Sequence, residues 1–407
     1  MHGLFIIFLS TVLLADVSVP PLPLKIRAEV YREDGPALRL VSGTATGHSA
    51  LTPDGRYLIY IDSGGLFVMS TKGGQPRKIG AAAPYFRLTP DAQYVLVPGS
   101  AWRRLSLGSQ DGPIDVAPKE RRHQLCGSAF SNEHVAFITA QGPMAVASIL
   151  EGTSIRLPVE PPVDRRCHAG AGCPRAFSPD GKWLLFQHGC YDNELIRVDG
   201  THRRFIGLVS AMFVDDLVVG SVEDKNGRIV FDRVEVVSLS DKKKRWKVKG
   251  TMLGSQPRRV PGKRAILQRD SEYRLVLIDL EKMKMRVLHQ GDERVTNSAE
   301  VTPDGKRGLY TTQHQKVGCA VHQVDLESGK RQRLALVEGA SQCFIKPLGN
   351  QRAVMYAWGK GAVVATIDLK TAVVQRLDVP PDSIGNLSTA GKSVTLNANG
   401  RLYLGRP

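Results

Sequence analysis

The chain has 407 residues, of which 42% are hydrophobic and 23% are charged, and it carries 55 Lys and Arg against 39 Asp and Glu. A folded chain of this length buries about 75% of its unfolded surface, which excludes a small domain that needs a disulfide or metal staple to fold. The formal net charge of +16 creates a field that attracts anionic partners.

The N-terminus carries a short apolar stretch from Leu4 to Leu14. About eleven residues match the apolar part of a secretory signal and are too few to span a bilayer comfortably. No Lys or Arg precedes the stretch, and cleavage after Ala15 would place Leu13 where a small residue is preferred. We expect a signal peptide over residues 1–15 and export, periplasmic by preference. A buried strand or an uncleaved anchor is the alternative.

Four nearly identical stretches follow along the chain. Each has an apolar residue, Ser or Thr, Pro, Asp, usually Gly, and then an aromatic or aliphatic run. Ser/Thr-Pro-Asp-Gly matches the preferences of a type I turn, because Pro pre-sets the backbone angle of its second position. The turn residues are Pro53 and Asp54, Pro90 and Asp91, Pro179 and Asp180, and Pro303 and Asp304.

Weaker corners fill the gaps between these copies, at Ser131-Asn132, Asp215-Asp216, Pro261-Gly262, Leu348-Gly349 and Ala390-Gly391. The resulting spacings of about 36 to 47 residues are typical of four-stranded propeller blades. The short, nearly continuous apolar runs indicate strands that are buried on both faces. We therefore predict an all-β protein with a single closed β-propeller of about eight blades, between seven and nine.

The two ends of the chain are expected to close the ring. The last unit supplies only Ser393–Leu396 and Arg401–Leu404 after its corner. The strand-like segment Ala37–Val41 is available to complete that sheet, which would remove an exposed sheet edge. This places an N-terminal segment with the ring-closing strand at residues 16–42 and the propeller at residues 43–407.

The repeated corner and the strand after it resemble the WD40-like (PD40) repeat of TolB-type bacterial β-propellers. This resemblance implies a non-enzymatic, periplasmic binding or scaffold module for a protein or an envelope polymer. Only 52 residues precede Pro53, which leaves no room for the α/β domain of TolB. Similar repeats form the gating propellers of prolyl-oligopeptidase-like peptidases, which append a hydrolase domain.

Six cysteines suit an exported protein, since such proteins use even sets for disulfides. The repeat places all six on one side of the disc, and Cys319 with Cys343 is the preferred pair because a blade's loop neighbours the connection to the next blade. The pairing of Cys126, Cys167, Cys173 and Cys190 stays open. A zinc or copper site that includes His123, His168 and His188 is an alternative, as are free thiols.

Catalytic signatures are mostly missing. The segment Gly47–Leu51 lacks the closing glycine of a nucleophile elbow, so His48 is expected in a loop. Residues Gly385–Ser393 have the wrong glycine spacing for a phosphate loop and lead into a strand. The turn explains the repeated aspartates. The sequence assigns no catalytic, cofactor or metal residue, although a propeller enzyme acting on sugars or lactones at the channel mouth is the alternative function.

The densest basic run is predicted to lie between two outer strands. It is either a solvated hairpin edge that deters aggregation or a docking patch for an anionic protein or envelope polymer. Nucleic acid is not expected as a partner, because export would separate the chain from it and because Trp246 alone interrupts the run, without a basic stripe of interleaved aromatic residues. No cofactor is expected, and a monomer is favoured. The candidate patch comprises Lys242, Lys243, Lys244, Arg245, Lys247 and Lys249.

Overall fold

A computed structural model shows the arrangement of the chain. It describes residues 24–33, 35–36, 38–44, 48–98, 102–108, 114–116, 128–139, 143–157, 173–188, 192–222, 229–230, 232–241, 244–251, 257–314, 317–359, 361–379, 385–398 and 401–407. Within these ranges there is no helix long and apolar enough to cross a membrane.

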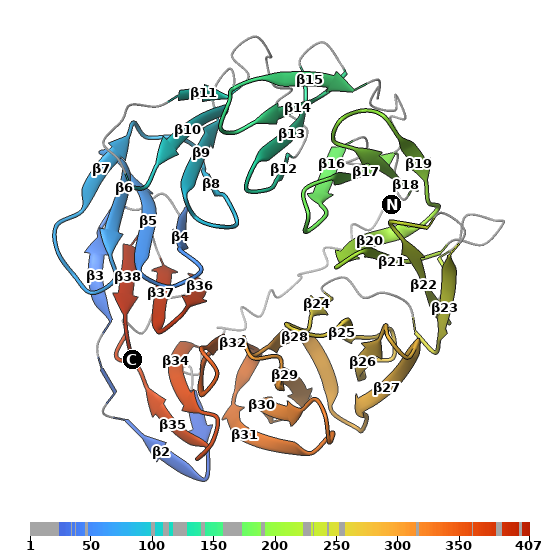
Figure 1. The fold of residues 1–407 in the computed structure, drawn as a ribbon. Coiled ribbons are helices and arrows are strands. Elements are labelled where there is room, and N and C mark those ends of the chain that lie inside the picture. The colour runs from blue at the N-terminus through green and yellow to red at the C-terminus, as the bar shows by residue number, and fades with distance from the viewer. Residues whose placement is uncertain are drawn as a thin grey trace, which may run out of the picture.

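The described residues form nine sheets arranged as blades around a ring (Figure 1), and the four core strands of each blade are antiparallel. In each blade the chain runs from an innermost strand outward in a meander, and the sheets stay separate from one another. The structure therefore confirms the all-β propeller, and its nine blades are the upper value of the predicted range.

Strand bounds follow the repeat. Blade 1 contains β4 (Ser49–Leu51), β5 (Tyr57–Asp62), β6 (Gly65–Ser70) and β7 (Arg77–Gly80); blade 2 contains β8 (Arg87–Leu88), β9 (Tyr94–Pro98), β10 (Trp102–Ser106) and β11 (Ile114–Val116); blade 3 contains β12 (Ala129–Phe130), β13 (His134–Ile138), β14 (Met144–Ser148) and β15 (Ser154–Leu157). Blade 4 contains β16 (Cys173–Phe177), β17 (Trp183–His188), β18 (Asp192–Arg197) and β19 (Arg203–Phe205); blade 5 contains β20 (Val209–Val214), β21 (Leu217–Ser221), β22 (Arg233–Ser238) and β23 (Arg245–Lys249); blade 6 contains β24 (Arg258–Arg259), β25 (Ala265–Arg269), β26 (Leu275–Asp279) and β27 (Lys284–His289).

The last three blades also take up N-terminal strands. Blade 7 contains β28 (Arg294–Val301), β29 (Arg307–His314), β30 (Gly318–Asp325) and β31 (Arg331–Glu338), with β1 (Lys25–Arg27) at its outer edge; blade 8 contains β32 (Ala340–Leu348), β33 (Arg352–Gly359), β34 (Gly361–Asp368) and β35 (Val373–Arg376), with β2 (Val30–Arg32) outside them; blade 9 contains β36 (Gly385–Ala390), β37 (Ser393–Ala398) and β38 (Arg401–Gly405), with β3 (Arg39–Ser42) as its fourth strand.

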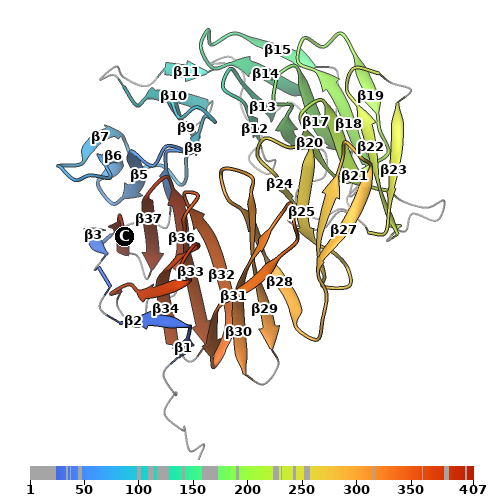
Figure 2. The same ribbon diagram turned by 60° about the horizontal axis from the view of Figure 1, so that its bottom comes forward.

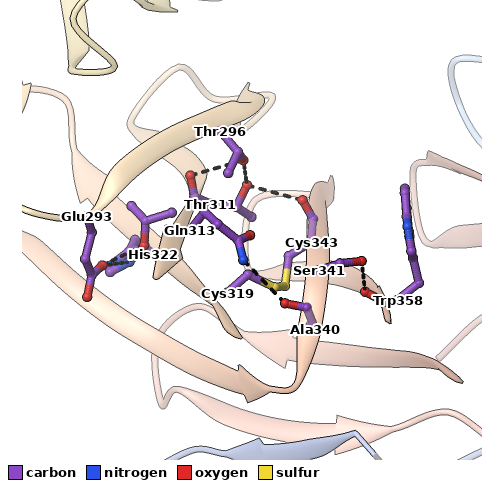
Figure 3. The surroundings of a disulfide bond; sticks show 11 residues. Glu293, Thr296, Thr311, Gln313, Cys319, His322, Ala340, Ser341, Cys343 and Trp358 are labelled. Carbon is purple, nitrogen blue, oxygen red and sulfur yellow. Dashed lines mark hydrogen bonds and ion pairs between the residues drawn. A yellow bond between two sulfur atoms is a disulfide. The ribbon is translucent and has the colours of Figure 1, made fainter. Parts of the chain in front are cut away.

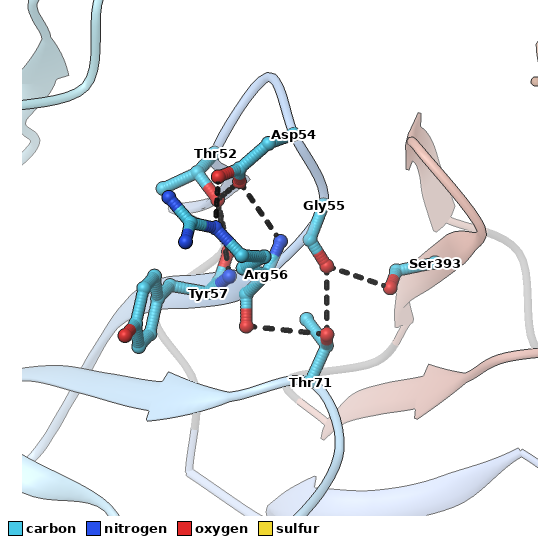
Figure 4. Close-up of polar contacts among 7 residues, drawn as sticks. All are labelled: Thr52, Asp54, Gly55, Arg56, Tyr57, Thr71 and Ser393. Atoms are coloured by element: carbon cyan, nitrogen blue, oxygen red, sulfur yellow. Dashed lines mark hydrogen bonds and ion pairs between the residues drawn. The ribbon is translucent and has the colours of Figure 1, made fainter.

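The repeated corner is held together by its own side chains (Figure 4). In blade 1 the Thr52 hydroxyl donates to Asp54 Oδ1 at 2.6 Å, and the N–H of Arg56 donates to the same oxygen at 2.9 Å. The N–H of Gly55 closes the turn on the carbonyl of Thr52 at 2.7 Å. The corners of blades 2, 4 and 7 repeat the hydroxyl-to-aspartate bond at 2.6–2.7 Å. Local chemistry therefore dictates where these four blades turn.

Blades are joined by apolar side chains from facing sheets. The described residues form nine buried clusters, one at each junction between neighbouring blades. The junction of blades 9 and 1, for example, buries Leu58 and Tyr60 against Leu402 and Leu404. The ring is thus complete in packing, and each sheet is covered on both faces.

The N-terminal segment binds the outer edges of three consecutive blades. Strand β1 pairs with β31, β2 pairs in parallel with β35, and β3 pairs with β38. In Figure 2 the blue strands β1 and β2 lie beside the orange and red blades. The predicted closing strand Ala37–Val41 is confirmed in place, with observed bounds of Arg39–Ser42. The sequence did not predict the pairing of β1 and β2.

Ring closure also depends on contact between the corners of blades 1 and 9. Ser393 Oγ donates to the carbonyl of Gly55 at 2.9 Å (Figure 4). A Cβ on Gly55 would lie 2.2 Å from the carbonyl oxygen of Ala390, and the φ of Gly55 is +69°. Only glycine satisfies both the left-handed backbone and the close approach.

We predict that Gly55→Ala lowers the free energy of unfolding by at least about 1 kcal/mol more than Gly181→Ala, because both lose a left-handed glycine but only Gly55 meets a neighbouring blade. Gly181 has the same φ of +69° and open space around it, so it is the matched control. Urea denaturation of the two variants measures the difference. Equal losses would show that the corners of blades 1 and 9 do not touch.

Candidate functional site

The disc has two different faces. The corners and the hairpins between third and fourth strands lie on one face, which we call the turn face. The hairpins between second and third strands and the connections between blades lie on the other, which we call the connection face. This division follows from the inner-to-outer meander of every blade.

The predicted turn aspartates are structural. The pKa of Asp54 falls to about 2, chiefly because the Thr52 hydroxyl and then the N–H of Arg56 donate to its carboxylate. For Asp180 and Asp304 burial opposes ionisation, but hydrogen bonds from Ser178 or Thr302 and from the backbone outweigh burial and lower the pKa. Their lone pairs are occupied within the turn, so these carboxylates have no catalytic geometry.

The predicted disulfide joins blades 7 and 8 on the connection face (Figure 3). Cys319 in β30 and Cys343 in β32 are bonded and buried, with their Cα atoms 6.0 Å apart. Around the bond, Gln313 Nε2 donates to the carbonyl of Ala340 at 3.4 Å, and the Thr311 hydroxyl donates to the carbonyl of Cys343 at 3.3 Å. Cys343 is the fourth residue of the innermost strand β32, opposite Ala357, and does not lie in the connection that the repeat predicted.

The other cysteine predictions fall largely outside the described residues. Cys173 is disulfide-bonded at the connection-face end of β16. Cys126, Cys167 and Cys190 lie outside the described ranges, as do His123 and His168 of the alternative metal site. In the part of the chain that is described, no group of three or more His, Cys, Asp or Glu side chains is placed to hold a metal.

The basic run lies at the outer edge of blade 5. Lys242 and Lys243 are outside the described residues, and Lys244 forms an ion pair with Asp241 at 3.8 Å. Arg245, Lys247 and Lys249 belong to strand β23 itself, not to a hairpin as predicted, and Arg245 pairs with the buried carboxylate of Glu235. Docking of an anionic partner here stays a prediction.

Several arginines have a structural role between blades. A guanidinium on the third or fourth strand of one blade donates to a carbonyl at the end of the third strand of the next blade. The contacts are Arg77 to Leu107 at 2.7 Å, Arg104 to Ile149 at 2.7 Å, Arg204 to Ser238 at 3.1 Å and Arg286 to Glu327 at 2.7 Å. Some of the arginines therefore connect neighbouring blades through hydrogen bonds. For this reason the net charge is a weaker indication of an anionic partner than the sequence suggests.

A pocket lies on the connection face at the inner edge of blades 1 to 3, where Figure 1 shows β4, β8 and β12. We call it the channel-mouth pocket; its volume is about 320 Å³. Its lining contains His48, Tyr85, Phe86, Arg87, Trp102, Ser128 and Phe130.

Four rings form a row across this pocket. The centroids of His48 and Tyr85 are 6.2 Å apart, those of Tyr85 and Trp102 are 6.2 Å apart with the rings edge to face, and those of Trp102 and Phe130 are 5.0 Å apart, also edge to face. Aromatic pairs at these separations attract one another. Because the four rings come from three different blades, the row bridges these blades. We call this row the aromatic wall.

Polar groups stand beside the aromatic wall. The side chains of His48 and Arg87 are exposed. The Ser128 hydroxyl is buried and has no hydrogen-bond partner among the described residues. A ligand in this pocket would therefore meet apolar ring surfaces, one permanent positive charge and one available hydroxyl.

A second polar cluster is buried between blades 6 and 7. The Tyr310 hydroxyl lies 3.0 Å from His289 Nδ1, and His322 Nε2 lies 2.8 Å from the Thr312 hydroxyl. Thr312 in turn donates to Glu293 Oε2 at 2.6 Å. The Tyr310 and His322 rings stack with centroids 4.9 Å apart. The contacts form two hydrogen-bonded groups that meet through ring stacking: Tyr310 with His289, and His322 with Thr312 and the partly exposed carboxylate of Glu293.

Burial controls the protonation of this cluster. Desolvation lowers the pKa of His322 to about 4 despite the nearby Glu293, and it lowers the pKa of His289 with help from the positive charge of Arg331. Burial raises the pKa of Tyr310 to about 12. Both histidines are therefore neutral at pH 7, and the contact between His322 and Glu293 is not an ion pair at that pH.

The cluster does not have the geometry of a hydrolytic triad. In a triad the hydroxyl and the carboxylate contact opposite nitrogens of the imidazole. Here the Thr312 hydroxyl at 2.8 Å and the Glu293 carboxylate at 3.4 Å both approach Nε2 of His322. The cluster is a buried network that stabilises the junction.

Sequence reasoning missed the channel-mouth pocket and the histidine cluster. His48 was expected only as a loop residue. A usable signal was the aromatic residue at or just before the innermost strand of successive blades, Tyr85 before β8 and Phe130 in β12. No comparable signal marks His289 and His322, which are 33 residues apart in sequence and meet only through blade packing.

Comparison with known proteins gives limited similarity. No family model matches the chain, so the TolB-type resemblance rests on the repeat alone. The chain is 29% identical over 150 residues to the uncharacterized peptidase YuxL of Bacillus subtilis. The matched region covers 33% of this chain and 20% of that protein. The chain thus matches about a fifth of the length of this curated relative.

Similar solved structures include the dihydro-heme d1 dehydrogenase NirN, with a TM-score of 0.48, 15% identity and coverage of 74% of this chain and 67% of that one. The tricorn protease has a TM-score of 0.42 and 13% identity over 88% of this chain and 42% of its own. AztD from Citrobacter koseri has a TM-score of 0.46 and 11% identity, and the match covers 80% of this chain and 93% of that one. At these values the likeness concerns strand arrangement and says nothing about activity.

The expectation of a non-enzymatic protein is contradicted by the curated match. The curated relative is named as a peptidase, so part of this chain is similar to a protein named as an enzyme. The error arose because turn and strand patterns specify the propeller and carry no information on whether it serves a scaffold or an enzyme.

We predict that the free energy of unfolding falls as the pH drops from about 6.5 to 4. Folded His322 has a pKa of about 4 and an unfolded histidine about 6.5, so the unfolded chain binds more protons in this window and is favoured as acid is added. The loss should be on the order of 3 kcal/mol. Urea denaturation across this range measures it.

His322→Gln should reduce this pH dependence, while His202→Gln, at an exposed hairpin of blade 4, should retain it. If both variants keep the dependence of the unchanged protein, His322 is not the responsible group.

Proposed function

We propose that the protein takes part in peptide hydrolysis and that the channel-mouth pocket binds a ring-bearing side chain of the peptide. The observation that carries this proposal is the row of rings formed by His48, Tyr85, Trp102 and Phe130. Trp102 is buried and supports the wall from behind, whereas His48, Tyr85 and Phe130 are exposed or half-buried and offer edges and faces for another ring. A volume of about 320 Å³ lies at the small end of the range for ligand pockets, as one ring-bearing side chain requires.

The polar groups of the pocket fit a peptide. The exposed guanidinium of Arg87 can donate paired hydrogen bonds to a carboxylate, such as a peptide C-terminus. The Ser128 hydroxyl can bond the peptide backbone. Similarity to a peptidase supports peptide over other ring-bearing ligands. Because the pocket adjoins the innermost strands, a bound peptide would lie at the mouth of the ring.

We also propose that the protein works outside the cytosol, as the N-terminal segment predicts. The disulfide between Cys319 and Cys343 supports this setting, since structural disulfides persist in exported proteins and are rare in reducing compartments.

The test uses the full chain and pairs of dye-labelled tetrapeptides that differ only in phenylalanine or alanine at one position. We expect the phenylalanine peptide to bind at least about tenfold more tightly, by the size of one well-placed aromatic contact, and to be cleaved, as read by anisotropy and mass spectrometry. Tyr85→Ala should abolish the preference, whereas Tyr57→Ala, at an exposed tyrosine on the turn face, should retain it.

Two outcomes would overturn the proposal. Equal binding of both peptides removes the role of the pocket. Turnover of an oligosaccharide of uronic acids, with no cleavage of any peptide, replaces peptide hydrolysis with sugar chemistry.

A further inference from the structure

A groove separates blades 3 and 4 on the turn face, at the opposite side of the disc from the channel-mouth pocket. Its volume is about 650 Å³, twice that of the pocket. One wall consists of the ends of β13, β14 and β15 with their hairpin, and the other consists of the corner of blade 4 and the hairpin after β18. We call it the blade 3–4 groove.

Two aliphatic side chains are exposed to solvent on the blade 3 wall. Leu150 is 53% exposed and Ile155 is 44% exposed. Ile155 pairs across the sheet with Val146, which belongs to the buried cluster between blades 3 and 4. The apolar surface of the junction therefore continues into the groove, where the two blades leave it uncovered. Burial of this surface would favour any partner that covers it.

The same groove is acidic on a basic protein. Glu133, Glu151, Asp180 and Asp199 line it, against the cations Lys182 and Arg197, so the carboxylates outnumber the cations by two on a chain of charge +16. Arg197 already pairs with Asp199 at 3.2 Å. Within the described residues neither Glu133 nor Glu151 forms an ion pair. The negative charge that is left belongs to the blade 3 wall, next to Leu150.

The arrangement is held in place before any partner binds. Asp180 accepts from the Ser178 hydroxyl at 2.6 Å and from the N–H of Lys182 at 3.1 Å, and Asp199 accepts from the Thr201 hydroxyl at 2.6 Å. His134 in the lining is desolvated, which lowers its pKa, so it adds no positive charge at pH 7. A rigid groove loses little conformational freedom when it is filled.

We propose that the blade 3–4 groove binds a segment of another protein in which lysine or arginine is interleaved with leucine or isoleucine. The charge of the lining selects the cations, and the exposed aliphatic wall selects their neighbours. A small polyamine would satisfy only the first of these features. The inference does not depend on peptide hydrolysis, because the groove and the channel-mouth pocket lie on different faces and share no residue.

The experiment titrates the full chain with three hexapeptides and with spermine, using isothermal calorimetry at low and high salt. The peptides are acetylated and amidated and alternate lysine with leucine, lysine with serine, or glutamate with leucine. We expect the lysine–leucine peptide to bind at least tenfold more tightly than the other probes, and salt to weaken it. Glu133→Gln with Glu151→Gln should weaken it at least fivefold, and Leu150→Ser should do so separately.

The matched control replaces two carboxylates of other turn-face hairpins, Glu281→Gln with Glu327→Gln, which are exposed and outside the groove. It has the same change in net charge and should bind like the unchanged protein. Equal weakening by both double variants would mean that only the overall charge matters and would overturn the site. Spermine binding as tight as that of the lysine–leucine peptide would overturn a protein segment as the occupant.

Discussion

Each blade depends on its two neighbours for burial of its faces, and this constraint governs the whole structure. Strand β33 shows the principle, because Ala353, Met355 and Ala357 face blade 7 while Val354 and Tyr356 face blade 9. Alternate side chains of a strand point to opposite faces, so an isolated blade would expose apolar side chains on both of its faces. Only a complete ring covers all of them. The N-terminal strands at the edges of blades 7, 8 and 9, and the glycine contact between blades 1 and 9, serve this one requirement.

Much of the fold follows from the sequence because the corner is local. Thr52, Pro53, Asp54 and Gly55 form their turn through contacts among themselves, so the pattern is readable without knowledge of the rest of the chain. The five weaker corners also fall at the observed turns, because the buried strands around them keep their spacing. The strands β1 and β2 could not be read in this way. Each has three residues, and each forms only because an outer edge some 300 residues later is available.

The functional surfaces were harder to predict for the same reason. Cys319 and Cys343 could be paired from their places in the repeat, since those places fix the face of the disc. The channel-mouth pocket joins His48, Tyr85 and Phe130 from three blades, and its shape depends on how neighbouring connections pack. The net charge of the whole chain did not predict the charge of its individual surfaces. The chain is basic, yet arginines such as Arg286 connect neighbouring blades, and the blade 3–4 groove is acidic.

The measurement that tests ring closure most directly is cysteine trapping between β3 and β38. Leu40 and Tyr403 are register partners, and partners in antiparallel strands lie within the Cα separation that a disulfide spans. The variant Leu40→Cys with Tyr403→Cys, oxidised mildly and mapped by mass spectrometry, should yield a peptide linked at 40 and 403 and resist unfolding more than its reduced form. An unlinked pair in a folded protein would contradict a ring closed by its N-terminal strand.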